Sequence, residues 1–128
     1  MANDEHLAIL DRGVQAWNKW ALENPLIFPD LMGANFSNAN LSRARLDYAN
    51  LRHTDLSGAN LSSAYLRVAT ISTAILQNTD LTNAGIGETI FADTDLSQAI
   101  GLDSMFHDGP SHSIVLDCAI QTVLNQEG

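Results

Sequence analysis

The stretch that decides the fold is residues 34–61, which read ANFSNANLSRARLDYANLRHTDLSGANL. Large apolar residues recur at every fifth position, and an alanine or threonine stands two positions before each of them. The spacing of five continues in both directions without a gap, so it is a repeat and not a chance coincidence. The large-residue series consists of Leu31, Phe36, Leu41, Leu46, Leu51, Leu56, Leu61, Leu66, Ile71, Leu76, Leu81, Ile86, Phe91 and Leu96.

The second series, of small residues, runs from Ala34 to Ala99 and contains ten alanines and four threonines. An α-helix cannot bury both series, because residues two apart, such as Ala34 and Phe36, point about 200° apart around it. A flat strand places these two residues on one face but turns Leu41 to the other, since five is odd. A corner at every fifth residue removes the conflict. Repeated corners wind the chain into coils that stack like parallel strands about 4.8 Å apart.

The position before each large residue is Asp or Asn eight times in fourteen. Short polar side chains of this kind hydrogen-bond nearby backbone and tolerate turn geometry. We therefore expect them to support the corners. The Asn-x-Ser triplets that begin at Asn35, Asn40 and Asn60 then follow from the repeat and do not indicate glycosylation.

Stretches such as Ala34-Asn-Phe-Ser-Asn, Ala39-Asn-Leu-Ser-Arg and Ala59-Asn-Leu-Ser-Ser resemble the motif of pentapeptide repeat proteins. The resemblance covers about residues 29–100. It implies an all-β solenoid, a right-handed, four-sided (quadrilateral) β-helix with four repeats in each coil and therefore about 3.5 coils. The opening segments Glu5-His-Leu-Ala-Ile-Leu and Ala16-Trp-Asn-Lys-Trp resemble the helical leader of cyanobacterial members.

The chain divides into three parts: a capping helix with its linker (1–28), the repeats (29–100) and a C-terminal loop with a capping segment (101–128). Helical spacing of apolar residues predicts one amphipathic helix over residues 5–23 that covers the open end of the first coil. Asn3 supplies its start and Asn24-Pro25 its end, and Trp17 is expected to seal the coil and not to form a ligand platform. The apolar residues of this helix are Leu7, Leu10, Val14 and Trp17.

The last member of the large-residue series is Leu96, because glycine occupies the next position of the spacing, residue 101. We expect a loop over residues 101–112 and a short helix over 113–125, with a terminal strand as the alternative. This segment is expected to fold over Ile90 and Ile100, which are large residues at a position that is mostly polar elsewhere. The glycines of Gly85-Ile-Gly predict a widened or bulged corner.

The composition excludes several classes of protein. The chain has 128 residues and a net charge of −9, with 6 basic and 15 acidic residues, and so lacks the positive surface of a nucleic-acid binder. One cysteine excludes a disulfide framework, and no apolar run approaches the roughly 18 residues that span a membrane. The acidic start predicts no signal peptide and therefore a cytoplasmic location.

No motif for chemistry is present. The sequence lacks a nucleophile elbow, a phosphate-binding glycine loop and a His-Glu-x-x-His motif. Its four histidines, His6, His53, His107 and His112, match no metal-ligand spacing, and Cys118 lies in an apolar stretch where a buried thiol is expected. We therefore expect no catalytic residue, no cofactor and no metal site.

A function must then come from the outer surface. Twenty residues per coil place Arg45 beside Tyr65 and Tyr48 beside Val68 in neighbouring coils, and tyrosine and arginine are enriched at interaction hot spots. The alternative is an ordinary solvated side with cross-strand pairing. The candidate interaction surface consists of Arg45, Tyr48, Tyr65, Arg67 and Val68.

The function that the sequence predicts is a rigid, non-enzymatic scaffold that binds a protein partner, not nucleic acid or membrane. The alternative, known for some members of the family, is a DNA-mimicking protein that binds a topoisomerase such as gyrase. That activity needs dense negative charge, whereas residues 29–100 hold seven acidic residues and four arginines, a net charge of −3. A homodimer formed through the end of a coil is left open.

Overall fold

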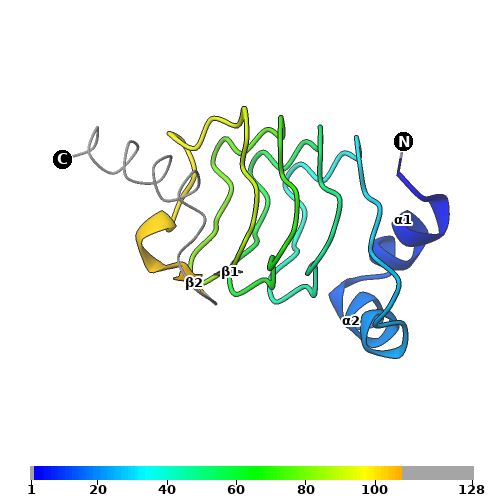
Figure 1. Cartoon of the computed structure of the whole chain (residues 1–128). Coiled ribbons are helices and arrows are strands. Elements are labelled where there is room, and N and C mark those ends of the chain that lie inside the picture. Colours follow the sequence, from blue (N-terminus) through cyan, green and yellow to red (C-terminus); the bar gives the residue numbers. More distant parts are fainter. Residues whose placement is uncertain (1, 108–128) are drawn as a thin grey trace.

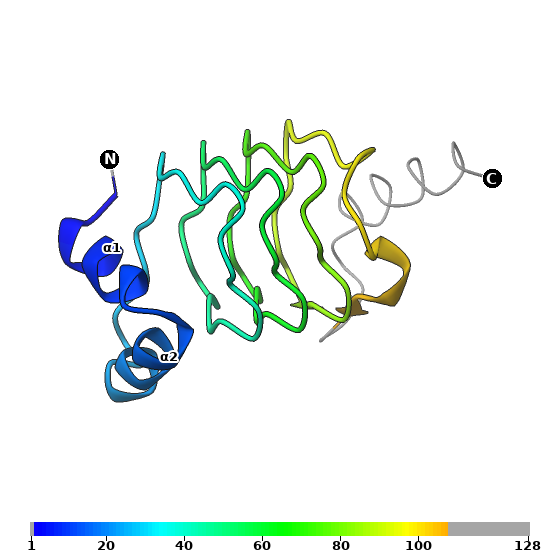
Figure 2. The same cartoon turned by 180° about the vertical axis from the view of Figure 1, so that it is seen from behind.

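The structure is a computed structural model that describes residues 2–107. Two helices, α1 (Asp4–Asp11) and α2 (Val14–Glu23), lie at one end of a stack of coils (Figure 1). A 3₁₀ helix, η1 (Leu102–Ser104), and a short strand, β2 (Phe106–His107), lie at the other end, as the reverse view also shows (Figure 2). The chain thus advances from one end of the stack to the other.

The stack is held together by parallel pairing between residues twenty apart. The pairs run from Asp30 with Asn50 to Asp80 with Ile100. Each is a single bridge, and the two-residue strands β1 (Gly85–Ile86) and β2 form a small parallel sheet. We call the paired residue, which directly precedes each large residue, the bridge position. The predicted solenoid is confirmed in this coarser sense: the repeat region is a β-helical solenoid.

Most corners are four-residue turns. In the first one the N–H of Ala34 donates to the carbonyl of Leu31 at 3.1 Å, and Gly33 between them has a φ of 78°. This combination is typical of a type II turn, whose third residue needs a positive φ. A positive φ recurs at every fifth residue up to Asp93, at glycine in some corners and at L-residues in the others. The non-glycine corner residues are Asn38, Arg43, Tyr48, His53, Ser63, Val68, Thr73, Asn78, Asn83, Glu88 and Asp93.

The core lies along the axis of the coils. All members of the large-residue series are buried except Phe36, which is half-buried. Alanines of the small-residue series pack beside them. Three of the four threonines at these positions, Thr54, Thr79 and Thr89, are buried as well, and Thr94 is half-buried. The hydroxyl of Thr79 donates to the carbonyl of Leu56, 23 residues earlier, at 2.6 Å. This bond satisfies a buried polar group and joins two coils.

Polar bridge residues brace the corners, as the sequence predicts. The Oδ1 atom of Asp55 accepts hydrogen bonds from the N–H of Ser57 at 3.0 Å and from its hydroxyl at 2.6 Å. Asp95 has the same arrangement with Ser97. Hydrogen bonds from these serine hydroxyls, and then from the backbone N–H groups, lower the pKa of both aspartates because they stabilise the charged form.

The prediction of one N-terminal helix is wrong, because the helix breaks at Gly13. This glycine has a φ of 109°, which an α-helix does not accommodate, and it separates α1 from α2. The start is as predicted: the side chain of Asn3 accepts from the N–H groups of Glu5 and His6. Among the predicted apolar residues Leu10 and Trp17 are buried, whereas Leu7 and Val14 are half-buried.

The prediction of a loop from residue 101 is also wrong for the described part, which contains η1 and β2. Strand β1 pairs with β2 with Gly85 opposite Phe106, an offset of 21 residues, so the last coil holds one residue more than the others. Gly85 therefore belongs to a paired strand, and the corner that follows it, at residues 87–88, is a bend without the usual turn hydrogen bond. Ile90 and Ile100 are half exposed. The helix predicted over residues 113–125, which was expected to cover them, lies outside the described residues.

Candidate interaction site at the junction of helix α2 and the first coil

Helix α2 is held against the first coil by side-chain hydrogen bonds to the backbone. Trp17 is fully buried, and its Nε1 donates to the carbonyl of Arg45 at 2.9 Å. The side chain of Asn18 donates to the carbonyl of Arg43 at 3.0 Å and accepts from the N–H of Arg45 at 2.8 Å. The two bonds to the backbone of Arg45 occupy groups that a preceding coil would otherwise pair. Together with the bond to Arg43, they hold α2 against the first coil.

Beside this contact lies an aromatic cluster of His6, Trp17 and Trp20. The Trp20 ring is 4.9 Å from each of the other two ring centroids. The buried His6 ring accepts a hydrogen bond at Nδ1 from the N–H of Asp30 at 3.0 Å, so its proton sits on Nε2. Trp17 is thus a packing residue, in line with the expectation that it seals the coil.

The segment that leaves α2 exposes an unusual amount of apolar side chain. Leu26 is 90% exposed, and Leu22 and Phe28 are 62% and 60% exposed. Ile27 and Tyr48 are also exposed. Exposed apolar residues that adjoin one another mark interaction sites far more often than single ones do. We call Leu22, Leu26, Ile27, Phe28 and Tyr48 the junction surface.

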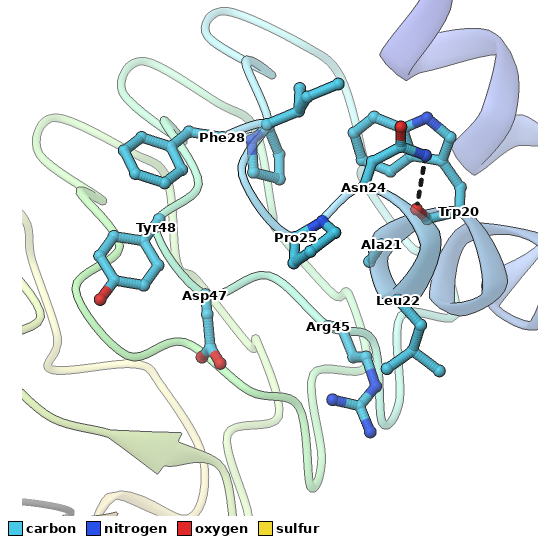
Figure 3. Close-up of a pocket in the computed structure, with 11 residues that line it drawn as sticks. Trp20, Ala21, Leu22, Asn24, Pro25, Phe28, Arg45, Asp47 and Tyr48 are labelled. Atoms are coloured by element: carbon cyan, nitrogen blue, oxygen red, sulfur yellow. Dashed lines mark hydrogen bonds between the residues drawn. The ribbon is translucent and has the colours of Figure 1, made fainter.

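Two aromatic rings bring the linker and the solenoid together in this surface. Phe28 and Tyr48 are stacked, with ring centroids 4.8 Å apart and planes only 10° from parallel. Figure 3 shows the two rings side by side. Pro25 separates this pair of rings from Trp20. A hollow of about 230 Å³ lies among these residues and is lined in addition by Arg45 and Asp47. The hollow thus combines apolar walls with one cationic and one anionic side chain.

The five residues predicted as an interaction surface differ in their contacts. The guanidinium of Arg45 lies over the ring of Tyr65, 5.1 Å from its centroid, a cation–π contact between neighbouring coils. Tyr48 instead pairs with Phe28 and belongs to the junction surface. Arg67 is exposed, and its N–H donates to the Oδ1 of Asp47 at 2.8 Å. Val68 is half-buried at its corner.

Sequence reasoning missed most of the junction surface. Phe28 stands twenty residues before Tyr48, so the coil spacing extended one step backward would have placed the two rings together. A second signal was the apolar run Leu26-Ile-Phe between two prolines, in a segment assigned only as a linker. Nothing in the spacing of α2 indicates that Leu22 is exposed, because that depends on how the helix lies against the coil.

Residues 2–107 lack two features that would indicate another kind of site. In this part of the chain no three His, Cys, Asp or Glu side chains gather as metal ligands would. No buried side-chain nitrogen or oxygen in the same region lacks a hydrogen-bond partner. Neither described helix is long and apolar enough to cross a membrane. The junction surface is therefore the strongest candidate that the described residues offer.

Comparisons with known proteins find similarity to pentapeptide repeats. Residues 34–72 match the family described as pentapeptide repeats, in eight copies. Among solved structures, a pentapeptide repeat protein (Rfr23) from the cyanobacterium Cyanothece 51142 is 29% identical, with 62% of this chain and 60% of that chain covered and a TM-score of 0.31.

A second solved structure is HetL, a pentapeptide repeat protein involved in heterocyst differentiation regulation from the cyanobacterium Nostoc sp. strain PCC 7120. It is 27% identical, with 64% of this chain and 57% of that chain covered and a TM-score of 0.25. The chain thus spans less than two thirds of the length of either structure. No curated protein matches it. The eight matched repeats, together with parallel pairing at a spacing of twenty residues, show that residues 34–72 consist of pentapeptide repeats.

Proposed function

We propose that the chain is a non-enzymatic scaffold that binds another protein through the junction surface. The single observation that carries the proposal is the exposed apolar group formed by the linker and Tyr48, in which Leu26 is 90% exposed and the rings of Phe28 and Tyr48 are stacked. Leaving such side chains in water is unfavourable, and a partner that covers them gains about 25 cal/mol for each Å² of apolar surface buried.

The scaffold itself is inferred to be a right-handed, four-sided β-helix of about 3.5 coils with the N-terminal helices as its cap. The spacing of twenty between paired residues, with a corner every five, supports four sides. The hydrogen bonds from Trp17 and Asn18 to the first coil support the cap. Such a solenoid presents its surface at little conformational cost, because few of its side chains or loops must become ordered on binding.

The hydrogen bonds around Tyr48 also favour a preformed site. Its N–H donates to the carbonyl of Arg67 at 2.8 Å, and its corner conformation directs the side chain outward, where it is half exposed. Aromatic side chains lose few rotamers on binding and supply much contact area, which is why they are frequent among hot spots. Arg45 and Asp47 at the edge of the hollow provide charges for orientation.

The experiment compares three forms of the affinity-tagged chain in capturing partners from a cell extract. The double variant Phe28→Ser/Tyr48→Ser removes both stacked rings. The matched control is Ile75→Ser, which removes a side chain that is 51% exposed on another side of the solenoid. Far-UV circular dichroism and melting temperatures establish that all three forms are folded.

We expect the double variant to lose a partner that the wild type and the control both retain. With that partner purified, titration calorimetry should show a loss of affinity of roughly 30-fold or more, the effect of removing one hot spot of about 2 kcal/mol. Equal affinity of the folded double variant and the wild type would remove the junction surface from the proposal. No observation in the described residues favours the topoisomerase-binding alternative.

A further inference from the structure

A second surface lies on another side of the first coil. It differs from the junction surface because some of its backbone N–H and carbonyl groups have no hydrogen-bond partner within residues 2–107. In the inner coils each bridge residue makes two hydrogen bonds to the coil before it. The N–H of Asp55, for example, donates to the carbonyl of Ala34 at 3.0 Å, and its own carbonyl accepts from the N–H of Phe36 at 2.7 Å. The bridge residues of the first coil have no preceding coil and need other partners.

Two of these four bridge residues find partners in the N-terminal segment. The backbone N–H of Asp30 donates to the Nδ1 of His6 at 3.0 Å, and its carbonyl accepts from the N–H of Asn3 at 2.9 Å. The backbone N–H of Arg45 donates to the Oδ1 of Asn18 at 2.8 Å, and its carbonyl accepts from the Nε1 of Trp17 at 2.9 Å. At both positions the helices therefore supply one acceptor and one donor, in the place of a coil.

The other two, Asn35 and Asn40, are left without such partners. Within residues 2–107 nothing accepts from their backbone N–H groups and nothing donates to their carbonyls. Both residues are exposed, so water solvates these groups. The first coil therefore has an open edge with two backbone donors and two acceptors, one of each at Asn35 and at Asn40. In the later coils, one repeat of the coil before pairs with the equivalent groups.

An apolar groove lies against this open edge. It has a volume of about 570 Å³ and runs between α1 and the first coil, with Leu7 and Leu10 on one wall and Phe36 and Leu41 on the other. Phe36 is the one member of the large-residue series that is not buried, and its place in this groove explains why. The only charged side chain that lines the groove among the described residues is Asp11.

We propose that this edge and groove bind an extended, apolar and basic peptide segment of another protein, which pairs in parallel with residues 35–40. Its main chain would supply carbonyls to the N–H groups of Asn35 and Asn40 and N–H groups to their carbonyls, and an apolar side chain would enter the groove beside Phe36. This is recognition by strand addition, in which backbone pairing supplies affinity and the groove supplies specificity.

Charge identifies the source of the peptide. The carboxylate of Asp11, at the end of α1, favours a cationic residue in the partner, as does the net charge of −9 of the chain. Residues 108–128 of the chain itself carry three acidic residues and no lysine or arginine. They are therefore a poorer match for this groove than a basic segment of another protein.

The probe is a fluorescein-labelled peptide, Lys-Lys-Ala-Asn-Leu-Ser-Ser-Ala-Tyr-Leu, which joins two lysines to the sequence of residues 59–66. These residues repeat the pattern of residues 34–41, with bridge, large and small residues at the same spacing. A control peptide has the same side chains, but the nitrogens of its two leucines are methylated and cannot donate to Asn35 and Asn40. Binding to the full chain is followed by fluorescence anisotropy.

We expect saturable binding of the probe, with the methylated peptide weaker by about tenfold or more because two hydrogen bonds are lost. Equal binding of the two peptides, or no binding of the probe at roughly 1 mM protein, would overturn the proposal. A synthetic peptide of residues 108–128 that binds more tightly than the probe would also overturn it, in favour of the chain's own C-terminal segment. If sedimentation shows that the chain is a dimer and that the probe dissociates it, the occupant is a second copy of the chain and the proposal is overturned.

Two variants place the binding on this edge. Asn35→Pro/Asn40→Pro removes two N–H groups that have no partner in residues 2–107, so the inner ladder stays intact, and binding should fall about tenfold. Asp11→Lys should weaken binding several-fold at low salt and little at high salt. Its control, Asp103→Lys, makes the same charge change at an exposed residue near the other end of the solenoid. Equal effects of the two lysine variants would refute the assignment to this groove.

Discussion

Replacing Arg43 by glycine should stabilise the protein, although glycine usually destabilises folded chains. Arg43 is a corner residue with a φ of 63°, in the left-handed region. An L-residue there loses roughly 1–2 kcal/mol relative to the right-handed region, and glycine avoids this loss. Glycine costs about 0.5–1 kcal/mol in unfolded-state entropy. The net expectation for Arg43→Gly is a gain in unfolding free energy of about 0.5–1 kcal/mol.

The matched control is Arg52→Gly. Arg52 is also exposed, and its loss changes the net charge equally, but it stands one residue before its corner and its φ is not positive. Only the entropy cost of glycine applies there, so a loss of about 0.5–1 kcal/mol is expected. The two variants should then differ by roughly 1–2 kcal/mol in unfolding free energy, or about 3–8 °C in melting temperature.

Differential scanning calorimetry of the wild type and both variants, at one protein concentration and pH, measures this difference. Arg43→Asn provides an independent check, because asparagine tolerates the left-handed region and retains a polar side chain. If Arg43→Gly lowers the melting temperature as much as Arg52→Gly does, the corner conformation carries no steric cost. The reasoning about the corners would then be wrong.

Three further predictions concern the core, the last coil and pH. Leu56→Ala should cost about 2–5 kcal/mol in urea unfolding, and Phe36→Ala clearly less because Phe36 is only half-buried; equal losses would contradict the burial seen here. Gly101→Ala should lower the melting temperature strongly, since φ is 82° and an added Cβ would lie 2.6 Å from backbone atoms of the neighbouring coil; an unchanged value would contradict this packing. The lowered pKa of Asp55, caused first by the hydroxyl of Ser57, contributes stability that is present above the unfolded-state pKa of about 3.9 and is lost as pH falls through the folded-state value. Asp55→Asn should therefore flatten the decline in melting temperature below about pH 4, and an unaltered pH profile would argue against the contribution.

Much of the fold follows from the sequence because the deciding forces are local. The spacing of Leu51, Leu56 and Leu61 allows a common inward direction only if the chain turns between them, and this holds whatever lies elsewhere in the protein. The hydrogen bonds of Asp55 with Ser57 are equally local, since they join residues two apart. A residue pattern within one repeat is sufficient for both.

The two predictions that the structure contradicts concern the segments on either side of the repeats. A helical pattern continued through Gly13, but its φ of 109° breaks the helix, and hydrophobic spacing does not report on backbone conformation. Strand β2 has no periodic signal because it is two residues long and owes its pairing to β1, which lies 21 residues earlier. At both ends the structure depends on contacts with the terminal coils and not on the preference of the segment itself.

The candidate site divides in the same way. The stacking of Arg45 beside Tyr65 could be predicted, because the coil length determines which residues become neighbours. The exposure of Leu22 and Leu26 could not, since it depends on the angle at which α2 lies against the coil. Hydrogen bonds from Trp17 and Asn18 to the backbone of the first coil set that angle.

By itself, then, the sequence determined that the chain winds into stacked coils and which side chains face the axis, because burial and turn geometry repeat within every five residues. Tertiary structure alone decided which edges of the first coil have partners. Asp30 and Arg45 are paired by the N-terminal helices, whereas Asn35 and Asn40 are open. The four residues occupy equivalent places in the repeat. Their difference therefore comes from long-range docking, which no pattern of neighbouring residues encodes.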